Sequence, residues 1–161
     1  MTDVFTTAKR SEVMSRIHSR GNKDTEVALI RFLRQSGVVG WRRNVPMFGK
    51  PDFIFRDARL TIFVDGCFWH SCPYHCKMPQ NNRGFWAQKL EANKRRDKLV
   101  NRTLRSMGWR TLRIWEHELS QKNECRLFHR IQRALREAHL VILKQSGPRK
   151  RRNAHQNGWP S

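Results

Sequence analysis

The chain has 161 residues, the length of one ordinary domain that can bury a core without disulfide bonds. Lys and Arg number 33 against 13 Asp and Glu, and the resulting net charge of +20 predicts a polyanionic partner. We expect this partner to be nucleic acid, because the basic residues run through the whole sequence. No apolar run reaches the ~20 residues of a membrane span, so we expect no role at a membrane.

The N-terminal segment MTDVFTTAKR lacks the apolar core of a secretory signal. We therefore expect a cytoplasmic chain with reduced thiols that are free to bind metal, rather than two disulfide bonds. The cysteines are Cys67, Cys72, Cys76 and Cys125.

The first half of the chain predicts a helix followed by three strands. Residues 8–20 are basic and weakly helical, and a firmer helix begins with Asp24 or Thr25 as its cap and stops at Gly37. Val27, Ile30 and Leu33 form its expected apolar stripe. Short β-prone runs follow at 41–45, 51–57 and 60–66, and the last two predict adjacent antiparallel strands.

The second half predicts a long helix, a strand and a last helix. Residues 85–107 form the long helix, with a core face made by Trp86, Leu90, Val100 and Leu104. Residues 109–115 alternate as a strand, and residues 124–139 form the last helix, whose apolar side holds Leu127, Ile131, Leu135 and Ala138. The order predicts an α/β (α+β) fold with a small mixed sheet flanked by helices. We expect one domain over residues 1–143 and a basic, disordered tail over 144–161.

Possible metal ligands crowd between the third strand and the long helix. The spacing Cys67-x4-Cys72-x2-His75-Cys76 offers thiolates and imidazoles, the usual ligands of zinc. A loop this short supplies two or three ligands, so a distant donor should complete the tetrahedron. We favour His117 over Cys125 for that position, and Cys76 remains an alternative to His75. A closed tetrahedron makes the zinc structural and leaves His70 free.

Asp52 stands out among the few acidic residues, because it follows Pro51 at the start of an apolar strand. A basic protein that cleaves nucleic acid usually needs carboxylates to hold Mg²⁺, since hard cations prefer oxygen ligands. The alternative is that Asp52 caps the strand or pairs with an arginine. Residue type and position do not separate these two interpretations.

Four segments resemble, in order and spacing, the very short patch repair (Vsr) endonucleases, bacterial enzymes of the PD-(D/E)xK nuclease superfamily. They are GKPDFIF (49–55), TIFVDGCFWHSCPYH (61–75), FWAQKLEANKRRD (85–97) and GWRTLRIWEHEL (108–119). The resemblance spans residues 8–120 and implies a restriction-endonuclease-like fold with a structural zinc site. It also implies a nick in one strand 5′ to the thymine of a T:G mismatch, the product of 5-methylcytosine deamination.

The resemblance implies a role for individual residues. Asp52 would hold the catalytic Mg²⁺ together with the backbone carbonyl of Val64, and Glu26 would lie near this site. His70 would activate the attacking water, a task suited to imidazole near neutral pH. The structural zinc ligands would be Cys67, Cys72, His75 and His117.

Aromatic and basic residues are expected to handle the DNA. The resemblance implies that Phe68, Trp69 and Trp86 intercalate beside the mismatch, and apolar wedges of this kind can kink a duplex. Lys89, Lys94, Arg95 and Arg96 would contact phosphates or form a solvated helix face. Asn93 and Asp97 match family positions without a role that the sequence assigns.

Two positions depart from the resemblance. The superfamily lysine after the second acidic residue is missing, as in Vsr-like enzymes generally, so His70 must replace it. Asp65 stands where some members have histidine, and it is either an additional acid of the active site or a cap for the turn before Gly66.

The expected partner is double-stranded DNA with a T:G mismatch, bound by a monomer that is nucleoid-associated and cooperates with mismatch-repair proteins. The alternatives are a nuclease of this fold with different or relaxed mismatch specificity, and a non-catalytic, zinc-stabilised DNA-binding module.

Overall fold

The computed structural model describes residues 23–145. Its elements are α2 (Lys23–Gln35), β1 (Trp41–Arg43), β2 (Phe53–Phe55), β3 (Leu60–Asp65), α3 (Arg83–Ser106), β4 (Arg110–Trp115), two short 3₁₀ helices, η1 (Glu116–Leu119) and η2 (Gln121–Asn123), and α4 (Glu124–Gln145). The predicted order of a helix, three strands, a helix, a strand and a helix is confirmed. The basic segment 8–20 and the end of the tail, 146–161, lie outside the described residues.

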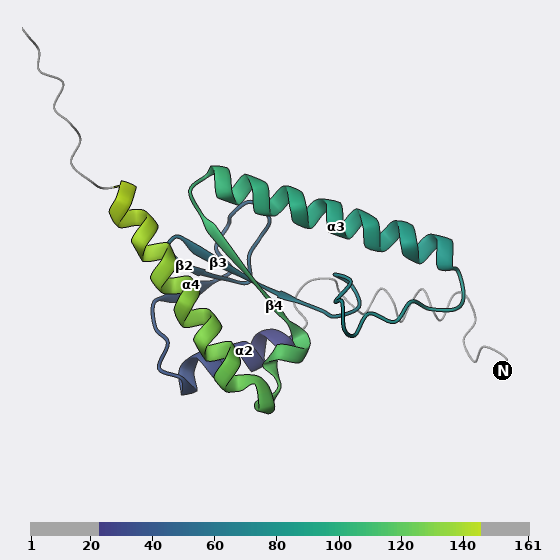
Figure 1. Ribbon diagram of the computed structural model, residues 1–161, viewed down its shortest axis with the longest axis horizontal. Helices are drawn as coiled ribbons and strands as arrows, with labels where there is room; N and C mark the ends of the chain where they lie inside the picture. Colours follow the sequence, from purple (N-terminus) through teal and green to yellow (C-terminus); the bar gives the residue numbers. More distant parts are fainter. Residues whose placement is uncertain (1–22, 146–161) are drawn as a thin grey trace, which may run out of the picture.

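The strands form one mixed sheet in the order β1-β2-β3-β4. β2 pairs antiparallel with β1 and with β3, as the sequence predicts for the last pair, whereas β3 and β4 are parallel. The parallel pair requires a crossover, which α3 provides (Figure 1). With this topology the start of β2, the end of β3 and the end of β4 lie at the same edge of the sheet.

Helices cover both faces of the sheet, with α2 and α4 on one face and α3 on the other (Figure 1). The larger core joins α2, the sheet and α4, and its fully buried side chains include Leu29, Leu33, Phe53, Leu60, Ile62, Ile114, Leu127 and Ile131. In the last helix the predicted apolar side is confirmed, with Leu135 partly buried.

The predicted apolar stripe of the first helix was wrong in one residue. Val27 is 46% exposed, whereas Leu29, Phe32 and Leu33 are buried. The spacing of three and four residues among the buried side chains places their common face almost opposite to Val27. The face of α2 that packs on the sheet is therefore the one that carries Leu29, Phe32 and Leu33.

α3 packs at both of its ends and extends past the sheet (Figure 1). The four predicted core residues, Trp86, Leu90, Val100 and Leu104, are its buried side chains. Val100 and Leu104 pack with Phe63 of β3. A Cβ atom at Gly49, where φ is +76°, would meet Val100 at 2.4 Å, so only glycine allows the loop before Asp52 to approach α3 this closely.

α4 continues to Gln145, beyond the predicted end at residue 139. Among residues 23–145, none of the helices combines the length and apolar character needed to cross a membrane.

Candidate active site and adjoining metal site

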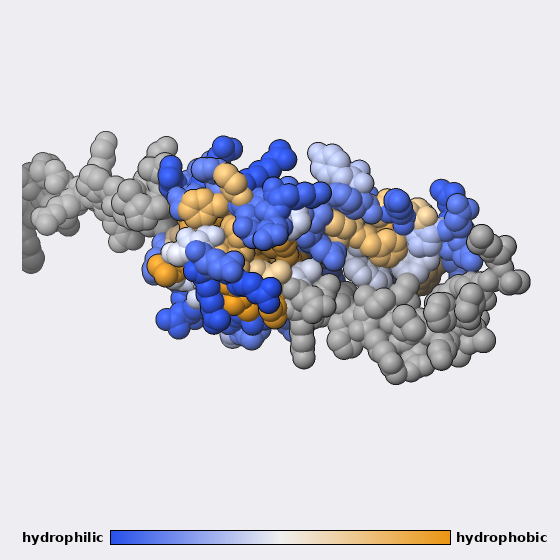
Figure 2. Space-filling view, turned by 90° about the horizontal axis from the view of Figure 1, so that it is seen from below, coloured by the Kyte–Doolittle hydropathy of each residue, from blue (hydrophilic) through white to orange (hydrophobic). Residues whose placement is uncertain are grey.

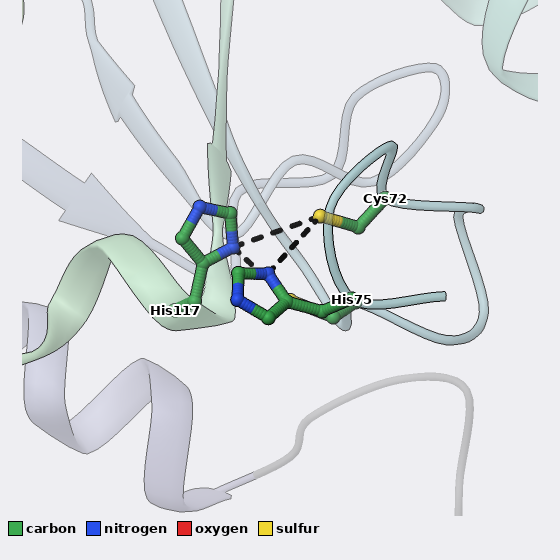
Figure 3. Close-up of side chains that lie close together, drawn as sticks. Cys72, His75 and His117 are labelled. Atoms are coloured by element: carbon green, nitrogen blue, oxygen red, sulfur yellow. Dashed lines mark hydrogen bonds between the residues drawn. The ribbon is translucent and has the colours of Figure 1, made fainter. Parts of the chain in front are cut away.

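The four residues favoured as zinc ligands come together in the structure. Cys67, Cys72 and His75 lie in the loop after β3, and His117 lies in η1, which directly follows β4. Because β3 and β4 are parallel, their ends bring the loop and η1 side by side. The ligand atoms of all four lie within 4.8 Å of one another. Figure 3 shows Cys72, His75 and His117 pointing toward one another.

The distances within this Cys/His cluster fit a tetrahedral zinc ion. The Sγ atom of Cys67 lies 3.2 Å from Nδ1 of His117, and Sγ of Cys72 lies 3.6 Å and 3.7 Å from Nδ1 of His75 and His117. Ordinary Zn–S and Zn–N bonds in a tetrahedron place sulfur and nitrogen about 3.6 Å apart. The donor set is therefore compatible with zinc.

The other thiols and the charge of the site agree with this assignment. Cys76 donates its S–H to the carbonyl of Phe68 and lies outside the cluster, as does the exposed Cys125. Burial, together with the neighbouring Cys72, raises the pKa of the Cys67 thiol to about 11. Two adjacent thiolates are thus unfavourable unless a cation neutralises them.

Asp52 lies at the start of β2, facing the end of β3. Its backbone N–H donates to the carbonyl of Ile62, and one carboxylate oxygen accepts the N–H of Val64 at 2.7 Å. The pKa of Asp52 is raised from 3.8 to about 6, mainly by burial and to a lesser extent by the carboxylates of Glu26 and Asp65, whereas the hydrogen bond from Val64 and the charge of Arg113 lower it. One alternative for Asp52 was an ion pair with an arginine. Among the ion pairs of the described residues, none joins Asp52 to an arginine.

Glu26 reaches the same edge of the sheet from α2 and forms an ion pair with Arg43 of β1. The Arg43 guanidinium lies over the ring of Phe53, with its carbon 5.7 Å from the ring centre. Glu26 is thus oriented by β1 and contributes negative charge beside Asp52.

His70 belongs to the loop between β3 and α3, and its side chain faces α3. Its Nδ1 atom is 2.7 Å from Oδ2 of Asp97, which belongs to α3. Burial opposes ionisation of Asp97, but the hydrogen bond with His70 and the charge of Arg113 hold its pKa below the usual range. The ionised carboxylate accepts the Nδ1 proton, which leaves Nε2 as the ring nitrogen with a lone pair.

Asp65 is 3% exposed, and both of its carboxylate oxygens pair with the Arg113 guanidinium, at 2.5 Å from Nε and 2.7 Å from Nη2. Asp65 also lies 3.8 Å from Nδ1 of His70. The carboxylate therefore faces Arg113 and His70, the arrangement expected of an additional acid at the candidate active site.

The predicted DNA-contacting aromatics form one cluster. The ring centres of Phe68 and Trp69 lie 5.2 Å apart, and Trp86 lies 5.3 Å and 6.0 Å from them. Asn93 donates to the backbone carbonyl of Trp69 at 2.9 Å, which anchors the loop on α3. Trp86 is only 9% exposed, whereas Phe85, which the sequence did not single out, is 59% exposed and packs against it.

The predicted basic residues of α3, Lys89, Lys94, Arg95 and Arg96, are all exposed. Arg95 makes a surface ion pair with Glu91 at 3.9 Å. On the face shown in Figure 2, hydrophilic residues surround the apolar patches. The helix thus presents positive charge to solvent next to the aromatic cluster.

Arg113 is the main residue that the sequence did not reveal. It lies within β4, in a segment whose sequence predicts alternating apolar and polar residues. An arginine at such a position in a strand indicates an acidic partner on a neighbouring element. No spacing rule identifies that acid as Asp65, because the two lie 48 positions apart.

Comparison with known proteins places the chain among the DNA endonucleases. The family model for the DNA mismatch endonuclease Vsr matches residues 2–77. A type II nicking enzyme of Neisseria meningitidis serogroup A, V.NmeAIP, is 38% identical over 139 residues, which cover 85% of this chain and 96% of that protein. The DNA mismatch endonuclease Vsr of Escherichia coli K12 is 35% identical over 119 residues, 72% of this chain and 74% of that protein.

The nicking enzyme V.NaeI of Lentzea aerocolonigenes is 49% identical over a shorter stretch of 69 residues, which spans 43% of this chain and 42% of that protein. The chain belongs to the Vsr family of endonucleases, as the resemblance in the sequence indicated.

Proposed function

We propose that this protein is a Mg²⁺-dependent endonuclease that nicks one DNA strand 5′ to the thymine of a T:G mismatch. The observation that carries the proposal is the position of Asp52 and of the His70–Asp97 pair at one edge of the sheet, beside the aromatic cluster. A carboxylate, an oriented imidazole and a base-stacking surface are the groups that such a reaction requires.

The charges at this edge support a divalent cation. The carboxylates of Glu26, Asp52, Asp65 and Asp97 lie near the guanidinium groups of Arg43 and Arg113. When His70 is neutral, two of the four negative charges are therefore not compensated. Asp52 and the Val64 carbonyl would hold Mg²⁺, which when bound neutralises the scissile phosphate.

His70 would act as the general base. With Nδ1–H donated to Asp97, Nε2 accepts a proton from the attacking water as its oxygen bonds to phosphorus. The bond from phosphorus to the leaving oxygen of the DNA backbone then breaks, and the strand is nicked. Asp97 stabilises the imidazolium that this transfer creates.

The aromatic cluster would provide selectivity for a mismatch. Inserting Phe68 and Trp69 between bases costs a few kcal/mol of unstacking, and the cost is lower at a mismatch than at a paired step. Trp86 would support these rings and stack with them, while Lys89, Lys94, Arg95 and Arg96 contact phosphates.

The remaining features of the proposal are supported by the resemblance to the Vsr family and, for the tail, by its basic composition. We propose a restriction-endonuclease-like fold that ends with α4, zinc as a structural ion in the Cys/His cluster, and a basic tail after α4 that adds nonspecific DNA affinity. The protein would act as a monomer on cytoplasmic, nucleoid-associated DNA, together with mismatch-repair proteins.

The test is incubation of the purified protein with labelled duplexes that carry a T:G or a T:A pair, with Mg²⁺ or with EDTA. We expect nicking of the T:G duplex alone and only with Mg²⁺. Equal nicking of several mismatches would support a nuclease of relaxed specificity. Tight, salt-sensitive binding without a nick in any duplex would contradict the proposal and favour a zinc-stabilised binding module.

A further inference from the structure

We propose that Arg113 is a positioning residue for strand cleavage, which it serves by holding Asp65 and Asp97 so that Asp97 orients His70. The inference rests on the proposed function, because His70 is the base of that reaction. Arg113 belongs to β4, whereas the residues that it joins come from β3 and α3. Three elements of the fold therefore meet at one guanidinium group.

The contacts of Arg113 use one edge of the guanidinium. Nε and Nη2 bind Asp65 side-on at 2.5 Å and 2.7 Å, and Nη2 also lies 3.0 Å from Oδ1 of Asp97 and, more distantly, 3.4 Å from Nδ1 of His70. The other oxygen of Asp97, Oδ2, bonds with His70 at 2.7 Å. Each carboxylate oxygen of Asp97 thus has its own partner, which fixes the plane of the carboxylate and the direction of the imidazole.

An aromatic ring packs on the guanidinium, and a hydrogen bond from α4 holds the backbone that carries it. Its carbon lies 5.1 Å from the ring centre of Phe63, a residue buried between the sheet and α3. The backbone carbonyl of Arg113 accepts a hydrogen bond from Arg130 of α4 at 2.6 Å, and Arg130 also pairs with Glu118. A side chain restrained in this way loses little further entropy when it orients its partners.

A surface salt bridge would not need such an arrangement. Side-chain exposures are 20% for Arg113, 4% for Asp65 and 18% for Asp97. A lysine in this position could neutralise the charge, but its single ammonium group could not bind Asp65 side-on and reach Asp97 in a fixed plane. The geometry therefore requires arginine for orientation and not only for charge.

The test compares single-turnover nicking of a T:G duplex by the wild type, R113M and R113K. We expect R113M to slow nicking by about 30- to 100-fold with little change in DNA affinity, as for a small misplacement of a catalytic group. R113K should recover part of the loss. The matched control is R110M on the same strand, which removes the exposed ion pair with Glu137 and should nick as the wild type does.

A double-mutant cycle separates positioning from a structural role. If Arg113 acts through Asp97, the variant R113M/D97N should nick no more slowly than D97N alone. Losses that multiply, or an R113M rate within threefold of wild type, would overturn the proposal. Should R113M fail to fold, the uncharged pair D65N/R113Q replaces it in the same cycle.

A second readout does not depend on nicking. In ¹⁵N NMR spectra, the His70 ring of the wild type should carry its proton on Nδ1, and R113M should show a mixture of the two tautomers. An unchanged tautomer would overturn the role of Arg113. If the wild type nicks no duplex while the tautomer shifts in R113M, the proposed function fails and the positioning by Arg113 stands.

Discussion

The loop between β3 and α3 serves two sites of opposite physical character. On one side, the Cys/His cluster is built from thiols and imidazoles, three of which lie within nine consecutive residues. On the other side, His70 depends on Asp97, Asp65 and Arg113, which come from α3, β3 and β4. The cluster brings together donors from one loop and one neighbouring element, whereas the environment of His70 consists of buried and partly buried charges that three distant elements must align.

Removal of a cluster ligand should have the largest effect. Replacement of Cys72 by serine takes away a buried thiol of the Cys/His cluster, and a structural zinc site, if the cluster holds one as proposed, contributes many kcal/mol to folding. We expect C72S to lose stoichiometric zinc and its cooperative thermal transition, measured by metal analysis and circular dichroism.

The control for the cluster is C76S, which changes a thiol in the same loop that lies outside it. C76S should keep zinc and a melting temperature within a few degrees of the wild type. If C72S is not obtained as a folded protein, a strong zinc chelator should lower the melting temperature of the wild type. Unchanged zinc content in C72S would contradict the ligand assignment.

On the active-site side, the substitution D52N should abolish nicking without loss of binding. We expect a decrease of about a thousandfold or more in the single-turnover rate, because the amide no longer offers the charge that holds Mg²⁺. The fold should persist, since the amide oxygen can still accept the N–H of Val64. Gel shifts measure DNA binding and single-turnover assays measure nicking on the same duplex. A D52N variant that nicks normally would exclude a role of Asp52 in holding Mg²⁺.

The substitution H70A tests whether the two sides of the loop are separable. General-base catalysis typically contributes about 10²–10⁴-fold, so nicking should fall by that order. Zinc content should remain stoichiometric, because His70 is not part of the cluster. Loss of zinc in H70A would show that the two sites form one unit.

Stability should report the burial of Asp52 in the absence of divalent metal. Its pKa is raised in the folded state, from 3.8 to about 6, so folding favours the protonated form. The wild type should therefore lose about 3 kcal/mol of folding free energy as the pH rises through this interval. D52N should match the wild type near pH 4 and be more stable above pH 6 in urea titrations with EDTA; a constant difference would contradict the shift.

The smallest effect should come from a single ring of the aromatic cluster. W69A removes a partly buried ring and should weaken binding to a T:G duplex by about 1–3 kcal/mol, the range of one stacking contact. W86A should in addition lower the melting temperature, because Trp86 is 9% exposed and packs against the other rings. Competition binding and calorimetry distinguish these results; equal affinity of W69A and wild type would exclude stacking by this residue.

The contrast between the two sides also explains what the sequence could predict. The cluster follows from ligand type and spacing, and His117 follows from its place just beyond a core strand whose end could bring it beside the loop. Helical periodicity likewise identified the buried residues of α3. These features depend on local chemistry or on one short step in topology.

The rest depends on contacts between distant elements. Val27 was misplaced because the apolar residues of α2 fit more than one helical face, and only packing on the sheet selects the face of Leu29, Phe32 and Leu33. Arg113 and the role of Asp97 were not predicted because nothing in the alternation of β4 identifies the acids on β3 and α3. Burial of Trp86 by three other rings likewise appears only after the loop is folded against α3.

The most direct measurement is the position of cleavage on a duplex with one T:G mismatch, labelled on either strand and resolved on a denaturing gel. The account predicts one Mg²⁺-dependent break, immediately 5′ to the mismatched thymine, with the guanine strand intact. Breaks in both strands, or the same break in the T:A duplex, would contradict it.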